Sequence, residues 1–286
     1  MSIPAGKLQV PELIAMKQRG DKIVMVTAYD APGARFAEDA GIDVILVGDT
    51  AAMVVLGHSG TTSVTVEEML FLTRTVSRQV HRPIIVGDMP FGSYETSDED
   101  AVRNAVRFVK EGGAEIVKLE GAGTMVSRAR AIVQAGIPVM GHVGLTPQSA
   151  TMLGGFKTQG RTAEAAQRIV EGAKELEDVG CCSLVLEAVP APVAARITRE
   201  LSIPTIGIGA GADCDGQVLV YHDLLGLSEG HLPRFVKRYA DLSAEIRDAL
   251  TAYATEVRSG AFPGEEHTYA MPEEEQAEFE AATNPK

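Results

Sequence analysis

Cysteine is rare in this chain and tryptophan is absent. Only three cysteines occur, two of them adjacent at Cys181 and Cys182, and they have neither the paired spacing of a zinc site nor that of a disulfide framework. A small disulfide-stabilised secreted scaffold and a zinc-dependent module are therefore both disfavoured. We expect the cysteines to be small, buried, apolar residues.

Long apolar runs and a secretion signal are also missing. No apolar run approaches the roughly 18 residues that a membrane-spanning helix needs. Residues 1–20 lack a basic segment followed by an apolar core and a cleavage site of small residues. We therefore expect a cytoplasmic protein with no membrane partner.

Basic residues are the minority among the charged ones. The chain has 26 Lys and Arg against 39 Asp and Glu, which gives a formal net charge of −13 at pH 7. It contains no stripe of clustered basic residues with interleaved aromatics, so nucleic acid is a poor candidate partner. We expect small-molecule substrates instead.

What the chain does contain is a repeated alternation of short Val- and Ile-rich runs with longer segments of helical periodicity. This pattern is typical of βα units around a parallel sheet, and eight such units close most naturally into a (β/α)8 TIM barrel. An open doubly wound sheet is the alternative, but the first turn, TAYDAPGA, contains no GxGxxG. The predicted strands are residues 23–27, 44–47, 83–86, 116–119, 138–141, 183–186, 204–208 and 218–221.

The length of 286 residues would allow two domains, but a barrel of this kind runs to roughly 250 residues as one domain. We predict a single barrel catalytic domain over residues 1–270, with an extra N-terminal helix at 11–19 and a final amphipathic helix at 240–257. Residues 271–286 are acidic and poor in core-forming residues, so we predict a disordered tail.

Ionisable residues end five consecutive predicted strands. In a TIM barrel the carboxyl ends of the strands form the active-site rim. A single Asp at such a position often only caps the next helix, and a lone His is often a hydrogen-bonded core residue, but five strands in a row indicate an active site. The residues at these ends are Asp49 with Thr50, Asp88, Lys118 with Glu120, His142, and Glu187.

The carboxylates among these residues indicate a metal site. Asp49, Asp88 and Glu120 offer only oxygen ligands, which suit a hard cation such as Mg²⁺. A rim rich in carboxylates would repel an anionic substrate unless a divalent ion and Lys118 reversed the local charge. A 2-oxo acid would then chelate the ion, which would stabilise its enolate. We also expect His142 to be a substrate contact and an alternative candidate for the base.

Ten segments of the chain, in order from about residue 10 to 269, resemble the ketopantoate hydroxymethyltransferase (3-methyl-2-oxobutanoate hydroxymethyltransferase) family. Each is weak evidence alone, but the ordered set, with the rare GHVGLTPQ and PGEEH, is specific. The segments are TAYD (27–30), VGDT (47–50), DMPF (88–91), KLEG (118–121), GHVGLTPQS (141–149), GGFKTQGR (154–161), LEAVP (186–190), IGIGAG (206–211), DGQVLVYHDLLG (215–226) and FPGEEH (262–267).

The resemblance implies a barrel enzyme that forms a high-order homo-oligomer, commonly a decamer, and uses Mg²⁺, with Mn²⁺ or Co²⁺ as alternatives. Its reaction transfers a hydroxymethyl group from 5,10-methylenetetrahydrofolate to 3-methyl-2-oxobutanoate. The product, 2-dehydropantoate, is used in pantothenate and coenzyme A biosynthesis. The sequence assigns no residue to the folate.

The resemblance also implies roles for individual residues. Asp49 and Asp88 would bind the metal and approach the substrate, and Glu120 would complete the metal site. Thr50 and Lys118 would contact the oxo acid, and Glu187 would be the proton acceptor.

The chain departs from the family pattern in two places. Thr50 stands where the family usually has Ser, which preserves the hydroxyl. Residues 57–61 read GHSGT where the family often reads GHDST, which leaves the details of that loop open. The glycine-rich segment 206–216 resembles a phosphate cradle. The family resemblance favours close backbone packing there instead.

Three rival functions share parts of this pattern. A lyase or mutase of the isocitrate lyase and phosphoenolpyruvate mutase type would use a similar barrel and metal without folate. An aldolase would use Lys118 to form a Schiff base. A catalytically inactive barrel would serve as an oligomeric scaffold, although intact ionisable groups on five strands argue against that reading.

Overall fold

The structure is a computed structural model, and it describes residues 6–228, 230 and 232–283. Its strands are short, rich in Val and Ile, and almost wholly buried on both faces, as expected for a parallel sheet covered by helices. They are β1 (Ile23–Thr27), β2 (Val44–Val47), β3 (Ile84–Asp88), β4 (Ile116–Lys118), β5 (Val139–Gly144), β6 (Ser183–Glu187), β7 (Thr205–Ile208) and β8 (Gly216–Leu219).

The strands pair in parallel from β1 through β8, and β8 pairs again with β1, so the sheet is a closed barrel. The predicted (β/α)8 barrel is confirmed, and closure rules out the open doubly wound sheet. Each predicted strand overlaps an observed one. Strand β8 is shifted by two residues and begins at Gly216, and β5 extends three residues beyond its predicted end, to Gly144.

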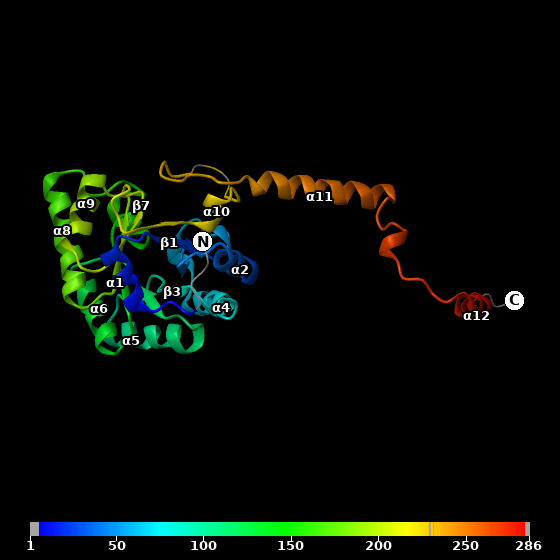
Figure 1. Cartoon of the computed structure of the whole chain (residues 1–286), viewed down its shortest axis with the longest axis horizontal. Coiled ribbons are helices and arrows are strands. Elements are labelled where there is room, and N and C mark those ends of the chain that lie inside the picture. Colours follow the sequence, from blue (N-terminus) through cyan, green and yellow to red (C-terminus); the bar gives the residue numbers. More distant parts are fainter. Residues whose placement is uncertain (1–5, 229, 231, 284–286) are drawn as a thin grey trace. The chain divides into compact units, whose positions relative to one another are not determined.

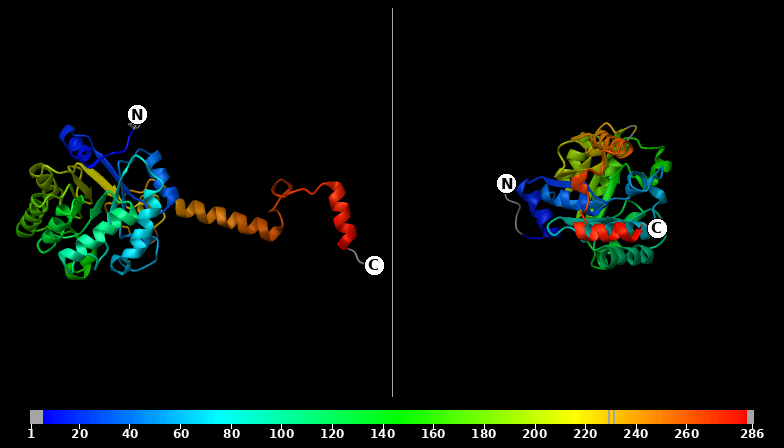
Figure 2. Two further views of the ribbon diagram at one scale, coloured as in Figure 1. Left: turned by 90° about the horizontal axis from the view of Figure 1, so that it is seen from below. Right: turned by 90° about the vertical axis from the view of Figure 1, so that its right-hand side faces the viewer.

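Helices surround the strands, as Figures 1 and 2 show. Several begin at side-chain caps that the sequence supplies: Asp30, Thr65, Ser97 and Thr162 each accept a hydrogen bond from the first helical turn. Up to residue 239 the helices are α1 (Val10–Arg19), α2 (Ala31–Asp39), α3 (Ala51–Val54), η1 (Thr61–Ser63), α4 (Val66–Ser77), α5 (Asp98–Arg107), η2 (Phe108–Gly112), α6 (Met125–Gln134), η3 (Pro147–Ser149), α7 (Ala150–Leu153), α8 (Ala163–Asp178), α9 (Ala191–Glu200) and α10 (Tyr221–Leu224).

Alternate residues along each strand face opposite sides of the barrel wall, and this parity separates two apolar clusters. The larger cluster lies between the strands and the surrounding helices. The smaller one fills the barrel interior and includes Val86, Ile116, Met140 and Val185. Residues two positions further along these strands therefore point to the same interior, nearer its carboxyl end.

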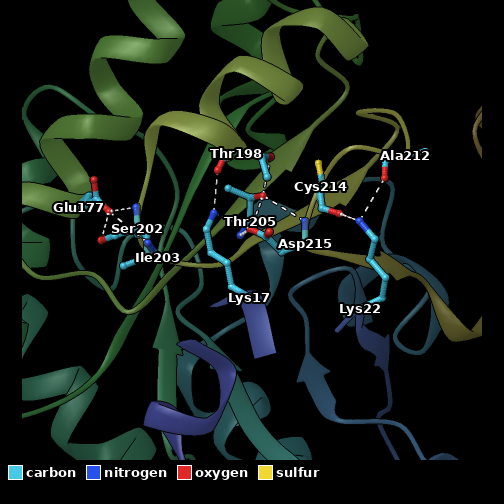
Figure 3. A network of polar contacts seen from close by, with 10 residues as sticks. All are labelled: Lys17, Lys22, Glu177, Thr198, Ser202, Ile203, Thr205, Ala212, Cys214 and Asp215. Carbon is cyan, nitrogen blue, oxygen red and sulfur yellow. Dashed lines mark hydrogen bonds and ion pairs between the residues drawn. The ribbon is translucent and has the colours of Figure 1, made fainter. Parts of the chain in front are cut away.

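Helix α1 closes the amino-terminal end of the barrel. Its Leu13 and Met16 belong to the interior cluster. Lys17 anchors it: Nζ donates to Asp215 Oδ2 at 2.8 Å and to the carbonyl of Thr198 at 2.8 Å (Figure 3). The same Asp215 oxygen accepts from the backbone N–H of Thr205 at 2.8 Å. This network ties α1 to the starts of β7 and β8.

The chain divides into two units, Met1–Tyr239 and Ala240–Lys286. The final amphipathic helix falls in the second unit, and the single catalytic domain over residues 1–270 stays a prediction. That unit contains α11 (Leu242–Ser259), η4 (Glu265–His267) and α12 (Glu273–Thr283). Helix α12 occupies most of the segment that we predicted to be disordered. Residues 273–282 of this helix are exposed, in keeping with the acidic composition that prompted the prediction.

Candidate active site

All the predicted site residues lie at the carboxyl-terminal end of the barrel. Asp88, Lys118 and Glu187 are the last residues of β3, β4 and β6, and His142 lies within β5. Because each stands two residues after a member of the interior cluster, parity turns all four side chains inward. Asp49 and Thr50 follow β2, where Thr50 leads into α3, and Glu120 lies two residues beyond Lys118.

Lys118 and Asp88 form a buried ion pair across neighbouring strands. They are register partners in β3 and β4, and Lys118 Nζ lies 2.8 Å from Asp88 Oδ1 and 2.9 Å from Oδ2. Burial disfavours the charged ammonium, but the charges of Asp88, Glu120 and Asp49 outweigh it and raise the pKa of Lys118. The neighbouring carboxylates therefore favour the cationic form of Lys118, which suits binding of an anion and not Schiff-base chemistry.

Asp49 is a buried carboxylate beside two other carboxylates. Its backbone N–H donates to Asp88 Oδ2 at 3.1 Å, and its Oδ2 accepts from Gln148 Nε2 at 3.0 Å. Burial, followed by the charges of Asp88 and Glu120, raises its pKa well above the usual range. Asp49 is therefore a buried acidic group, and the positive charge of Lys118 only partly offsets the effects that raise its pKa.

His142 lies between two carboxylates. Its Nδ1 is 3.4 Å from Glu120 Oε1, and its Nε2 is 3.3 Å from Glu187 Oε2. Neither nitrogen has a well-aligned hydrogen bond to any described residue, so these contacts are charge interactions more than hydrogen bonds. Burial and the charge of Lys118 would lower the pKa of His142, but Glu120 and Glu187 outweigh them and raise it to about 9.

Glu120 is held by several donors at once. Its Oε2 accepts from the backbone N–H of Gln148 at 3.0 Å, and its Oε1 lies 3.8 Å from Lys118 Nζ. Burial alone would raise its pKa, but the close contact with His142 and the charge of Lys118 lower it. Glu120 is therefore an ionised carboxylate that connects Lys118 to His142.

Gln148 and Tyr94 are polar site residues that the sequence analysis did not identify. The Tyr94 hydroxyl donates to Gln148 Oε1 at 2.5 Å and accepts from the backbone N–H of Glu120 at 3.1 Å. Gln148 in turn donates to Asp49, so the pair links two carboxylates. Gln148 lies in the GHVGLTPQS segment at the same rim, and this position was the only signal that could have identified it.

The backbone around Glu187 is unusually constrained. Gly144 faces it in the register with φ of +101°, and a Cβ there would lie 2.3 Å from the Glu187 carbonyl oxygen. Ala188, the next residue, is the one non-glycine residue in the described chain with positive φ, at 47°. Such strain persists only where neighbours determine the backbone, and it is common at functional sites.

The donor set can be tested against a divalent cation. In the described part of the chain, no three His, Cys, Asp or Glu side chains gather closely enough to hold an ion together. Asp49 and Asp88 are nevertheless neighbours, because the Asp49 backbone N–H donates to the Asp88 carboxylate. Glu120 instead contacts Lys118, His142 and Gln148. Magnesium is commonly bound through one or two carboxylates, with substrate oxygens and water completing its shell. The four carboxylates also outnumber the two cations, so the residues fit a hard cation.

A closed parallel barrel with ionisable groups from five strands at its carboxyl end is the arrangement of a barrel enzyme. The model of the family described as ketopantoate hydroxymethyltransferase matches residues 7–265. The chain belongs to this family and is an enzyme, a transferase. The sequence resemblance is thereby confirmed.

The curated relatives share more than half of their residues with this chain. A 3-methyl-2-oxobutanoate hydroxymethyltransferase of Moorella thermoacetica is 56% identical over 264 residues, which cover 92% of this chain and 98% of that protein. One of Carboxydothermus hydrogenoformans is 54% identical over 265 residues, covering 93% and 96%.

Solved structures with a similar fold are far more distant in sequence. The chain matches 2,3-dimethylmalate lyase, a member of the phosphoenolpyruvate mutase and isocitrate lyase superfamily, with a TM-score of 0.60 at 17% identity, covering 96% of this chain and 99% of that one. It matches phosphonopyruvate hydrolase in complex with oxalate and Mg²⁺ with a TM-score of 0.59 at 12% identity, covering 96% and 95%. These likenesses concern the fold alone.

The structure does not test the predicted roles, but it does place the residues. It brings Asp49, Asp88, Lys118, Glu120, His142 and Glu187 into one connected set of contacts. Thr50 lies beside this set, partly exposed. The three carboxylates predicted as metal ligands do not converge as a group of three, so the assignment of Glu120 as a direct ligand stays a prediction.

Among the described residues, no helix combines the length and the apolar character that spanning a membrane requires.

Proposed function

We propose that this enzyme transfers a hydroxymethyl group from 5,10-methylenetetrahydrofolate to 3-methyl-2-oxobutanoate, giving 2-dehydropantoate and tetrahydrofolate for pantothenate biosynthesis. The observation that carries the proposal is the pairing of a cation, Lys118, with a partly exposed carboxylate, Glu187, on the same inner face of the barrel. One group binds an anionic oxo acid, and the other accepts a proton. The family supports the choice of substrates.

Glu187 is the proposed base because it is the most accessible carboxylate of the set. Its side chain is 15% exposed, whereas those of Asp88 and Glu120 are 1% and 2% exposed. It accepts the proton from C3 of the oxo acid, and His142, held cationic by two carboxylates, stabilises Glu187 before the transfer. C3 then bonds to the one-carbon unit and water supplies the hydroxyl. The two bonds between that carbon and the folate nitrogens break, the nitrogens take up the proton from C3 and one from water, and tetrahydrofolate leaves.

Lys118 and Thr50 bind the oxo acid. The ammonium faces the anion, and Asp88 fixes its position through two hydrogen bonds. Thr50 offers its hydroxyl from the neighbouring strand end. Asp49 and Asp88 would hold a divalent cation, Mg²⁺ by preference with Mn²⁺ or Co²⁺ as alternatives, and Glu120 would complete that site. When bound, the ion supplies Lewis acidity toward oxygens on which negative charge develops.

A direct assay tests the proposal. Purified enzyme is incubated with 3-methyl-2-oxobutanoate and 5,10-methylenetetrahydrofolate, with Mg²⁺ or with EDTA, and 2-dehydropantoate is measured by mass spectrometry. Product should form with both substrates and Mg²⁺, and should disappear when either the folate or the metal is withheld. Turnover of an oxo acid without folate would instead support a lyase or mutase.

We further propose that the enzyme works as a homo-oligomer, a decamer by family resemblance, in the cytoplasm. Helix α11 supports the assembly, because its apolar residues recur at helical spacing yet remain largely exposed in the described chain. These are Ile246, Leu250, Tyr253 and Val257, which are between 46% and 62% exposed. Light scattering should give the decamer mass for the wild type and a smaller mass for Leu250→Glu.

A further inference from the structure

The part of the rim formed by β8 and β1 contains buried polar atoms that the proposed chemistry does not use. Tyr29 follows β1 and is 4% exposed, and its hydroxyl makes no well-aligned hydrogen bond with any described residue, although the hydroxyls of Thr27 and Thr50 lie nearby. Nδ1 of His222, in α10 just after β8, also makes no such bond with any described residue. Buried polar groups are normally paired, so two adjacent exceptions call for a ligand or a water.

The two side chains form one surface. Their ring centroids are 5.6 Å apart with the planes inclined by 45°, and Tyr221 packs edge-on against His222 at 5.8 Å. The Tyr221 backbone N–H donates to Thr27 Oγ1 at 3.0 Å, which ties the start of α10 to the end of β1. The surface therefore combines aromatic rings with unpaired hydrogen-bonding atoms just beyond the carboxyl ends of two paired strands.

This surface adjoins the oxo-acid site. Strand β1 pairs with β2, which leads to Asp49 and Thr50. The hydroxyls of Thr27 and Thr50 are near enough to the Tyr29 phenol to oppose the rise in its pKa, which burial and then the charges of Asp49 and Asp88 produce. Tyr29 is therefore positioned between the carboxylate part of the rim and His222.

The surface is also electrically different from the rest of the rim. Burial lowers the pKa of His222, although Asp223 and Asp30 oppose the change, so its imidazole is neutral at pH 7. Tyr29 is neutral as well. A ligand here would meet neutral donors and acceptors beside aromatic rings, whereas β2 to β6 present mostly charged groups.

We infer that Tyr29 and His222 bind the pterin ring of the folate substrate. A pterin is flat and uncharged, and it has ring nitrogens, an amine and a carbonyl at its edges, which match an aromatic surface with unpaired polar atoms. The inference rests on the proposed function. Transfer also requires the one-carbon unit, carried beside the pterin, to reach C3 of the oxo acid, and the adjacency of Tyr29 to Thr50 meets that requirement.

The test uses two variants that keep an aromatic ring and remove the polar atom, Tyr29→Phe and His222→Phe. Each should raise the KM for 5,10-methylenetetrahydrofolate about tenfold, as expected for loss of one hydrogen bond to a bound ligand. Calorimetric binding of tetrahydrofolate should weaken to a similar extent. The KM for the oxo acid, and the folate-independent exchange of its C3 hydrogen with deuterated water, should stay at wild-type values.

Tyr239→Phe is the matched control, because it removes the hydroxyl of an exposed tyrosine, and all its constants should match the wild type. Circular dichroism and thermal midpoints check that each variant folds. If both variants bind tetrahydrofolate as tightly as the wild type, the unpaired atoms hold water and the inference is overturned. If the two substitutions raise only the KM for the oxo acid, Tyr29 and His222 contact that substrate instead, and the inference is also overturned.

Failure of the proposed function would look different. Wild-type enzyme would then neither exchange the C3 hydrogen nor form 2-dehydropantoate. If the wild-type enzyme exchanges the C3 hydrogen and forms product, but the two variants keep the wild-type KM for the folate, only the assignment of the pterin site is overturned.

Discussion

The imidazole of His142 bridges Glu187 and Glu120, with Nε2 3.3 Å from one carboxylate and Nδ1 3.4 Å from the other. A third contact, between Glu120 and Lys118 at 3.8 Å, continues the chain of charges to the Lys118–Asp88 ion pair. The proposed base is thus connected to the proposed anion-binding cation through alternating charges. Substitution of Glu187 should therefore affect proton abstraction, and substitution of Lys118 should affect binding of the oxo acid.

Glu187→Gln should abolish proton abstraction while leaving substrate binding intact, because the amide keeps the size of the side chain but is not basic. The rate of C3 hydrogen exchange with deuterated water, followed by NMR with Mg²⁺ and no folate, should fall roughly 10²- to 10⁴-fold. Oxo-acid affinity should change little. Exchange at the wild-type rate would transfer the role of base to His142, the adjacent ionisable group.

Lys118→Met should raise the KM of the oxo acid roughly 10- to 100-fold, because it removes the buried cation but keeps a side chain of similar length. Borohydride treatment of the wild type with substrate should leave no adduct, since the carboxylates around Lys118 keep its amine protonated. The measurements are steady-state kinetics and intact-mass spectrometry. A reduced adduct on Lys118 would favour the Schiff-base aldolase.

Asp49→Asn should weaken Mg²⁺ binding by at least about tenfold in calorimetry, because it removes one of two adjacent oxygen anions. In metal-free protein at pH 7, however, the same change should raise the thermal midpoint. Asp49 is buried beside Asp88 and Glu120, so neutralising it removes repulsion from the folded state.

Asp88→Asn is the matched comparison for Asp49→Asn. It should also weaken Mg²⁺ binding, but it should raise the thermal midpoint less than Asp49→Asn does: burial raises the pKa of Asp88 as well, yet Lys118, at 2.8 Å, opposes that rise and would lose its carboxylate partner. Equal shifts of the midpoint in the two variants would contradict the difference in their charge surroundings. Unchanged Mg²⁺ affinity in both variants would mean that Asp49 and Asp88 do not bind the metal and serve only as helix caps.

Ala188→Gly should reduce kcat roughly 10-fold or more without lowering stability, since glycine adopts a φ of 47° without strain but holds the neighbouring Glu187 less rigidly. The Ala188 N–H donates to the Ile208 carbonyl at 2.8 Å, and its own carbonyl accepts from Gln159. Kinetics and thermal unfolding would measure the two effects. Ala188→Val, which increases the strain, should lower the thermal midpoint, and wild-type kcat in the glycine variant would show that the constraint is unnecessary.

Much of the architecture could be predicted from local patterns. Strands β1 and β2 have the predicted bounds, because each is a short, uninterrupted apolar run with a clear end. Strand β8 was displaced, because Gly216 and Gln217 lack the apolar character that marks a buried strand. The amphipathic helix predicted at 240–257 is present as α11, which has the apolar periodicity of a core helix but no buried side chain in the described chain.

The sequence by itself determined which residues reach the rim, since strand ends and the period of two settle the face and level of Asp88, Lys118, His142 and Glu187. Only the tertiary structure decided the partners among them. Glu120 contacts Lys118 and His142 instead of joining Asp49 and Asp88, and Tyr29 meets His222 across 193 positions of sequence. Such contacts depend on barrel closure, strand register and side-chain direction, which are long-range properties that no local pattern encodes.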